Sequence, residues 1–169
     1  MKKEKIFKDG ARPGTPMDAA LRFLGYSARS VREVERYLDS KQYSEFEISQ
    51  VIERLEELGL LDDARFAADF VESRLNTKPV SRRHLAEQLR AHELPAEAIE
   101  RALAAVDDDA ERQNAAAVAQ KYWRQLAQLP PRERYERTMR RLLGRGYDWD
   151  VARAALGALT DGEMEEELP

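Results

Sequence analysis

Arginine side chains are the groups in this 169-residue chain whose spacing could support binding chemistry. Residues 132–147 contain six arginines and only two glutamates. If this segment is a helix with about 100° per residue, one face carries Tyr135, Met139 and Leu142. The opposite face then carries Arg134, Arg137, Arg141 and Arg145. The pattern is typical either of a solvated helix face or of a positive surface for an anionic partner.

A second predicted helix has a similar excess of arginine. It contains Arg82, Arg83 and Arg90, and Arg74 lies shortly before it. Because the whole chain has a formal net charge of −4, two corresponding helices with the same bias favour one jointly formed positive surface. We therefore predict that the residues that bind a partner or DNA are Arg74, Arg82, Arg83, Arg90, Arg134, Arg137, Arg141 and Arg145.

Few residues could support catalysis or bind a metal ion. The chain has no cysteine, and its two histidines, His84 and His92, lack a histidine at the helical i, i+4 spacing. The acidic pair Asp62-Asp63 directly precedes an apolar helical pattern, so we expect it to cap that helix rather than to bind a metal. The sequence predicts neither an enzyme nor a cofactor or metal site.

The sequence also gives no sign of a membrane or secretory segment. No apolar run approaches the roughly 18 residues that a membrane span needs. The first residues are basic, but no apolar stretch follows them as in a secretory signal. We therefore expect a cytoplasmic protein without membrane contact.

An internal repeat organises the chain. Three triplets share spacings of four and then five residues, namely Val34–Leu38–Tyr43, Leu85–Leu89–Leu94 and Thr138–Leu142–Tyr147. Each triplet predicts the end of one helix and a turn, and a helical apolar pattern at offsets 0, 3, 4 and 7 follows. We expect this pattern to start at Ile48, Ile99 and Val151. No segment shows the alternation of a strand, so the sequence predicts an all-α fold of three tandem three-helix modules.

The modules are predicted to span residues 17–60, 61–106 and 107–159. Residues 1–16 contain five basic and two acidic residues, and residues 160–169 contain five acidic residues and no basic one. Neither terminal segment has an apolar face, so we expect a basic and an acidic flexible tail.

Helix starts and turns can be assigned within the modules. Capping boxes are predicted at Ser30–Glu33, Ser44–Glu47 and Asp108–Glu111, where the first side chain would accept a hydrogen bond from the backbone of the first turn. Phe46 and Trp149 follow the turns of the first and third modules. We expect both rings to fix these turns.

Several of these stretches resemble the RecX family of bacterial recombination regulators. The resemblance rests on residues 20–24 (ALRFL), residues 29–34 (RSVREV) and, above all, residues 59–67 (GLLDDARFA). It covers about residues 17–159.

The family commonly has Lys-Gly-aromatic after the second helix of a module. The third module keeps Arg145-Gly146-Tyr147, whereas Gln42 and Glu93 stand in place of the glycine in the first two. These residues adopt a left-handed turn less readily than glycine does.

The resemblance implies an elongated, curved repeat array that acts by binding. Its partner would be the RecA filament, which is RecA assembled on single-stranded DNA, and the effect would be mostly inhibition of recombinase, ATPase and co-protease activities. The resemblance implies no cofactor, and we expect a monomer with at most weak direct contact to DNA. The alternative is a direct DNA-binding protein built from helix-turn-helix-like modules, which the net charge of −4 disfavours.

Overall fold

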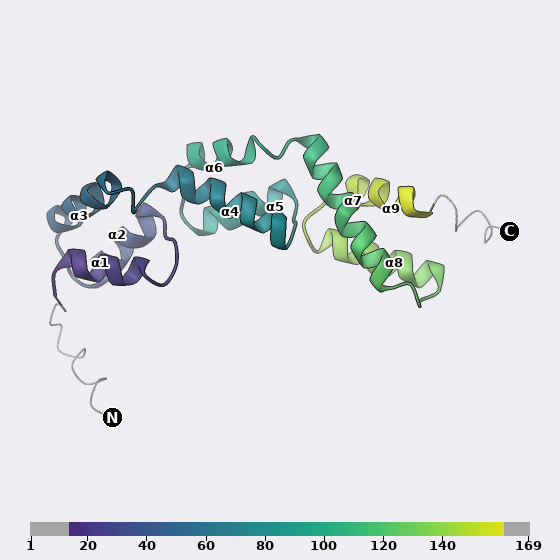
Figure 1. Ribbon diagram of the computed structural model, residues 1–169, viewed down its shortest axis with the longest axis horizontal. Helices are drawn as coiled ribbons and strands as arrows, with labels where there is room; N and C mark the ends of the chain where they lie inside the picture. The colour runs from purple at the N-terminus through teal and green to yellow at the C-terminus, as the bar shows by residue number, and fades with distance from the viewer. Residues whose placement is uncertain (1–13, 161–169) are drawn as a thin grey trace, which may run out of the picture.

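The computed structural model describes residues 14–160, and within this range every regular element is a helix. Figure 1 shows the helices as three bundles in an elongated, arched row, with α1–α3 at one end and α7–α9 at the other. The helices are α1 Pro16–Leu24, α2 Val31–Ser40, α3 Glu45–Glu57, α4 Asp63–Thr77, α5 Arg82–Ala91, α6 Ala96–Leu103, α7 Asp108–Gln125, α8 Pro131–Leu143 and α9 Trp149–Thr160. The predicted all-α array of three three-helix modules is confirmed.

The predicted tails lie mostly outside the described residues, in 1–13 and 161–169. Three residues of the predicted basic tail belong to the first module. Thr15 accepts a hydrogen bond from the Asp18 backbone at 3.1 Å, and Pro16 is the first residue of α1. At the other end, Thr160 is the buried last residue of α9.

Each module has a hydrophobic core of its own. The first is centred on Val34, Leu38 and Leu55, and the second on Leu85 and Leu89. The third contains Trp123, Leu142, Ala152 and Leu156. Leu61, the first residue of the predicted second module, packs in the first cluster, and no other buried residue of the described range joins the cluster of another module. Each module therefore buries its apolar surface by itself.

The predicted apolar positions of the third helix in each module are confirmed for the first two modules and wrong by one residue in the third. Ala154 and Ala158 are exposed, while Ala152, Ala155 and Leu156 are buried. The physical reason is that all three turns have the same length, so the pattern starts ten residues after the central leucine in every module.

The helix caps explain where most elements begin. The capping boxes of Ser30 and Ser44 are present as predicted, and Asp62 accepts a hydrogen bond from the Arg65 backbone at 2.9 Å. The predicted box at Asp108 is wrong, because Asp107 is the N-cap of α7 and accepts from the Ala110 backbone at 2.8 Å. This shift leaves Glu111 free for another partner.

The same left-handed turn follows the second helix in all three modules. Gln42 has φ 64°, Glu93 has φ 57° and Gly146 has φ 86°, so the two non-glycine residues adopt the same left-handed conformation as the glycine of the third module. The turn is fixed by the buried residue that comes next, which is Tyr43, Leu94 or Tyr147.

The expectation that two aromatic rings fix these turns is wrong. Phe46 is 70% exposed and Trp149 is 53% exposed. Both residues follow the buried turn residue by two or three positions, in the first turn of the next helix, where their side chains point away from the core.

Polar contacts link successive modules through the N-terminus of the second helix. The first free N–H of α2, at Val31, donates to the Asp63 carboxylate of α4 at 2.9 Å. The first N–H of α5, at Arg82, likewise donates to the Glu111 carboxylate of α7 at 3.1 Å. In both cases the backbone N–H lies in the first turn, where its own helix offers no acceptor, and an acidic side chain of the next module accepts the hydrogen bond instead. Asp63 is therefore a cap, as predicted, but for a helix of the preceding module.

The N-cap serine of the same helix makes a second contact with the next module. The Ser30 hydroxyl donates to the His92 carbonyl at 2.6 Å, and the Ser81 N–H donates to the Arg145 carbonyl at 3.0 Å. His92 and Arg145 occupy the same position of the repeat, directly before the left-handed residue. We call each pair of contacts a joint, so the structure has a first joint (modules one and two) and a second joint (modules two and three).

Close approach at the second joint requires glycine at position 146. A Cβ added there would lie 2.6 Å from the Ser81 Oγ and 2.9 Å from the His84 Cβ, and Gly146 also has a positive φ. At the first joint the equivalent residue is Glu93, and its carboxylate forms an ion pair with Arg36 of α2. The second joint is therefore the more tightly packed of the two.

We predict that Tyr147→Phe leaves stability unchanged or raises it. The Tyr147 hydroxyl is buried without a hydrogen-bond partner in the described structure, and burial raises the pKa of Tyr147 to about 12. The unfolded tyrosine ionises near pH 10, so wild-type stability should fall between about pH 10 and 12, and the Phe variant should lack this loss.

The matched control is Tyr43→Phe, since Tyr43 occupies the same repeat position but donates to the Gly14 carbonyl at 3.1 Å. Its melting temperature should fall, with a loss of about 1 kcal/mol. Thermal melts followed by circular dichroism measure both, and equal destabilisation by the two changes would contradict the analysis.

We predict that Gly146→Ala lowers the midpoint of urea unfolding. A left-handed alanine costs about 1–2 kcal/mol, and the close contacts with α5 add to this cost. Gly157→Ala is the control, because a Cβ at this helical glycine meets nothing within 4 Å and should stabilise by about 0.5–1 kcal/mol. The urea midpoint should fall in Gly146→Ala and rise in Gly157→Ala. An unchanged midpoint in Gly146→Ala would contradict the close packing inferred at the second joint.

Candidate partner-binding surfaces

The arginines predicted from the sequence fall into separate groups in the structure. Arg82, Arg83 and Arg90 are exposed on α5 and line one groove of about 470 Å³ at the second joint. Four carboxylates line the same groove, at Glu100, Asp108, Glu111 and Asp148. The groove therefore presents arginines within a mixed-charge surface, and it is not uniformly positive.

The second group lies on α8. Arg137, Arg140 and Arg141 line a hollow of about 320 Å³ together with Leu126. Arg137 is paired with Glu133 at 2.6 Å, whereas Arg140 and Arg141 have no carboxylate within 4.0 Å among residues 14–160. Arg140 was not among the predicted binding residues, because a helical projection places it beside rather than on the arginine face.

Arg134 has a structural role within the third module. Its Nε donates to the Trp123 carbonyl at 2.9 Å, and its guanidinium lies 4.0 Å from the centre of the Trp123 ring. Arg134 lies on the predicted arginine face but is only half-exposed, because it packs across α7 against the buried Trp123 ring.

Arg145 is also a structural residue, at the second joint. Its Nη1 donates to the Pro79 carbonyl of the second module at 2.6 Å, and its Nη2 donates to the Tyr122 hydroxyl at 2.8 Å. This hydrogen bond is the main reason why the pKa of Tyr122 is lowered. The predicted exposed position is wrong because α8 ends at Leu143, so the helical projection does not extend to Arg145.

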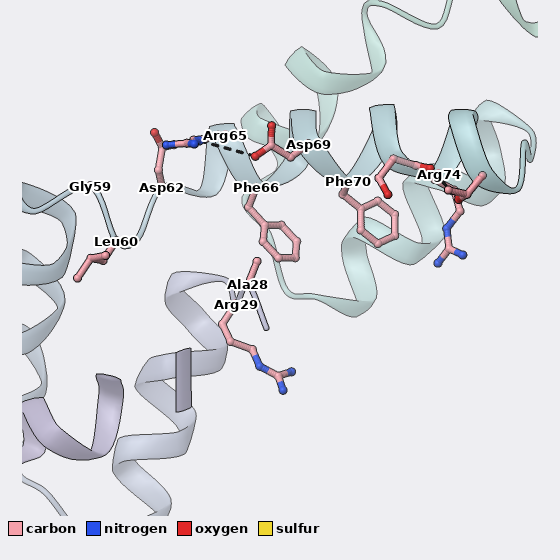
Figure 2. Close-up of a pocket in the computed structure, with 12 residues that line it drawn as sticks. Ala28, Arg29, Gly59, Leu60, Asp62, Arg65, Phe66, Asp69, Phe70 and Arg74 are labelled. Atoms are coloured by element: carbon pink, nitrogen blue, oxygen red, sulfur yellow. Dashed lines mark hydrogen bonds and ion pairs between the residues drawn. The ribbon is translucent and has the colours of Figure 1, made fainter. Parts of the chain in front are cut away.

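Arg74 lines a hollow of about 670 Å³, which lies between the first and second modules. Its guanidinium is 5.3 Å from the centre of the Phe70 ring. Figure 2 shows Phe66 and Phe70 extending from α4 toward Ala28 and Arg29 of the first module. We call this hollow the first-joint groove.

Sequence reasoning missed two arginines of the first-joint groove. Arg29 comes from the connection between α1 and α2, and Arg65 comes from the first turn of α4. Neither belongs to an arginine-rich helix face. Arg65 shares α4 with Arg74, whereas Arg29 reaches the same groove only because the first module approaches the second. The arginines of α4, α5 and α8 thus line three different hollows rather than one.

His92 contacts residues of both modules at the first joint. Its ring lies edge-on to Phe66 and Phe70, with centroids 5.1 and 5.5 Å apart, and its Nδ1 is 3.1 Å from the Glu33 carboxylate. Across the part of the chain that the structure describes, no three His, Asp or Glu side chains are placed to hold a metal ion. No described helix is both long and apolar enough to cross a membrane.

Family models match all three modules. They are described as the first, second and third three-helix domains of RecX, and they match residues 17–55, 62–103 and 109–156. A crystal structure of RecX from Lactobacillus salivarius has 25% sequence identity, covers 85% of this chain and 94% of its own, and superposes with a TM-score of 0.71.

Relatives named Regulatory protein RecX align over most of the chain. The Mycolicibacterium smegmatis protein is 34% identical, covering 80% of this chain and 74% of its own length, and the Prosthecochloris aestuarii protein is 31% identical, covering 85% and 92%. The chain spans only 57% of the Bacillus subtilis relative, which is 30% identical to it. The matches of all three modules and these alignments show that the chain belongs to the RecX family of regulatory proteins.

Proposed function

We propose that this chain regulates RecA by binding to RecA filaments on single-stranded DNA, and that binding mostly inhibits the recombinase, ATPase and co-protease activities. The observation that carries the proposal is that RecX family models match every module of the row. An elongated row of modules also suits a filament, because successive modules can contact successive protomers of a repeating partner.

The proposed mechanism is binding rather than chemistry. The exposed arginines of α5 and α8 would contact acidic protein surfaces or filament DNA, and Arg74 would add a contact at the first joint. Arg134 and Arg145 would act indirectly, by holding the third module and the second joint. In this proposal the chain acts in the cytoplasm as a monomer, without a cofactor or catalytic residue, and makes only weak direct contact with DNA.

Within the proposed surface, α8 is the best candidate for an electrostatic contact. Arg140 and Arg141 are exposed and have no carboxylate partner in residues 14–160, so their charge is available to an anionic partner. The arginines of α5 share their groove with four carboxylates. We therefore expect a larger effect of charge reversal on α8 than on α5.

The double change Arg140→Glu and Arg141→Glu is expected to raise the concentration needed for half-inhibition of RecA ATPase at least about tenfold, which corresponds to about 1.4 kcal/mol of binding free energy. Arg83→Glu with Arg90→Glu on α5 should have a smaller effect. Both double variants should melt near the wild-type temperature, because exposed substitutions usually change stability within about ±0.5 kcal/mol.

The control is Arg54→Glu with Arg101→Glu, which makes the same charge change at exposed arginines of α3 and α6. It should inhibit like the wild type. If wild-type protein leaves RecA ATPase unchanged, the proposed function is wrong. If it binds bare single strands as tightly as RecA-coated strands at one salt concentration, direct DNA binding is the better account.

A further inference from the structure

The arginines at the end of α8 form an exposed positive surface within the third module. Arg137, Arg140 and Arg141 line the hollow of about 320 Å³ together with Leu126, and we call these three arginines the α8 surface. Glu133 pairs with Arg137 at 2.6 Å, whereas Arg140 and Arg141 have no carboxylate within 4.0 Å among residues 14–160. Two of the three charges are therefore not offset by the described part of the chain.

The guanidinium groups of this surface keep hydrogen-bond donors available. The Arg141 guanidinium lies 5.3 Å from the centre of the Tyr122 ring, an arrangement that occupies the face of the guanidinium and leaves the N–H groups at its edge. Arg140 is exposed in the last turn of α8 and makes no side-chain hydrogen bond or ion pair within the described residues. Both arginines can donate to carboxylates, which bind a guanidinium through two parallel hydrogen bonds.

Carboxylates distinguish this hollow from the two grooves at the joints. Asp62 and Asp69 line the first-joint groove, and four carboxylates line the groove at the second joint. Among the described residues, no carboxylate lines the hollow on α8. Of these three hollows, only the one on α8 would present an acidic segment with positive charge and no negative charge in its wall.

The chain itself contains an acidic segment directly after the third module. Residues 161–169, which lie outside the described range, contain five acidic residues and no basic one. They follow Thr160, the buried last residue of α9, and α9 lies beside α8 in the same bundle (Figure 1). Nine extended residues reach about 30 Å, which exceeds the length of about 20 Å that 13 residues give α8. The segment is therefore long enough to reach the α8 surface.

We propose that residues 161–169 bind the α8 surface of their own chain and compete there with an anionic partner. The glutamates of the segment bind Arg140 and Arg141, and the covalent link keeps their effective concentration near the millimolar range. Exposed ion pairs are individually weak, so a partner with more negative charge displaces the segment. The contact itself does not depend on the identity of the partner, whereas competition with RecA rests on the proposed function.

The contact is tested with a spin label in the acidic segment of the full-length, ¹⁵N-labelled chain. Because the chain has no cysteine, Met164→Cys gives a single labelling site. We expect the label to raise the relaxation rates of the backbone amides of residues 137–141 at about 50 mM salt. Raising the salt to about 0.5 M should reduce this enhancement at least about threefold, because salt screens ion pairs between exposed groups.

Matched charge reversals separate the α8 surface from the general charge of the module. Arg140→Glu with Arg141→Glu should reduce the enhancement as strongly as salt does. Arg112→Glu with Arg153→Glu makes the same charge change at exposed arginines of α7 and α9 and should keep the wild-type enhancement. The contact is disproved if the enhancement is independent of salt, if the control pair abolishes it, or if it arises between separate labelled molecules, which would make a second copy the source of the segment.

The competition is tested by inhibition of RecA ATPase. The quadruple change Glu163→Gln, Glu165→Gln, Glu166→Gln and Glu167→Gln should lower the concentration for half-inhibition at least about threefold, because the segment no longer occupies the α8 surface. An unchanged concentration overturns the competition. If the wild type leaves RecA ATPase unchanged, the proposed function fails, and the spin-label measurement alone then decides whether the segment binds α8.

Discussion

The arrangement of the whole molecule depends on how the N-terminus of the second helix in each module finds hydrogen-bond partners. The first N–H groups of α2 and α5 have no acceptor within their own helices, and carboxylates of the next module supply it, Asp63 to Val31 and Glu111 to Arg82. Since each module already has its own apolar core, these polar contacts help to orient one module against the next. A helix N-terminus requires a particular direction of approach, so each of these contacts, together with the serine contact of the same joint, restricts how two modules lie against each other.

The joints also determine where a partner can bind. The two larger grooves, of about 670 and 470 Å³, both lie where modules meet, and each takes its walls from two modules. A change in the angle at a joint would therefore reshape a groove without disturbing any core. A partner that contacts two modules stabilises one angle between them, so binding at a groove and the geometry of the row affect each other. The hollow on α8 differs, since it lies within the third module and keeps its shape when a joint moves.

Periodicity and capping rules predicted the local structure well, because these features depend on residues close in sequence. The triplet ending in Tyr147 located the third turn, and Ser30 was identified as a cap. The same reasoning failed for Arg145, which lies beyond its helix and binds Pro79, 66 residues earlier. Asp63 looked like a cap for its own helix, but it binds Val31, 32 residues away. Joints and grooves could not be predicted from one sequence, since local spacing contains no information on which modules approach each other.

The adjacent residues Asp62 and Asp63 permit the most direct test of the claim that polar joints hold the row. Because the chain has no cysteine, Gln50→Cys on α3 and Glu97→Cys on α6 can carry two spin labels, and their distance distribution can be measured by double electron–electron resonance. Asp63→Ala should broaden this distribution, since it removes the acceptor for Val31, whereas Asp62→Ala removes only the cap of α4 and should leave the distribution narrow. An unchanged distribution in Asp63→Ala, or equal broadening in both variants, would contradict the account.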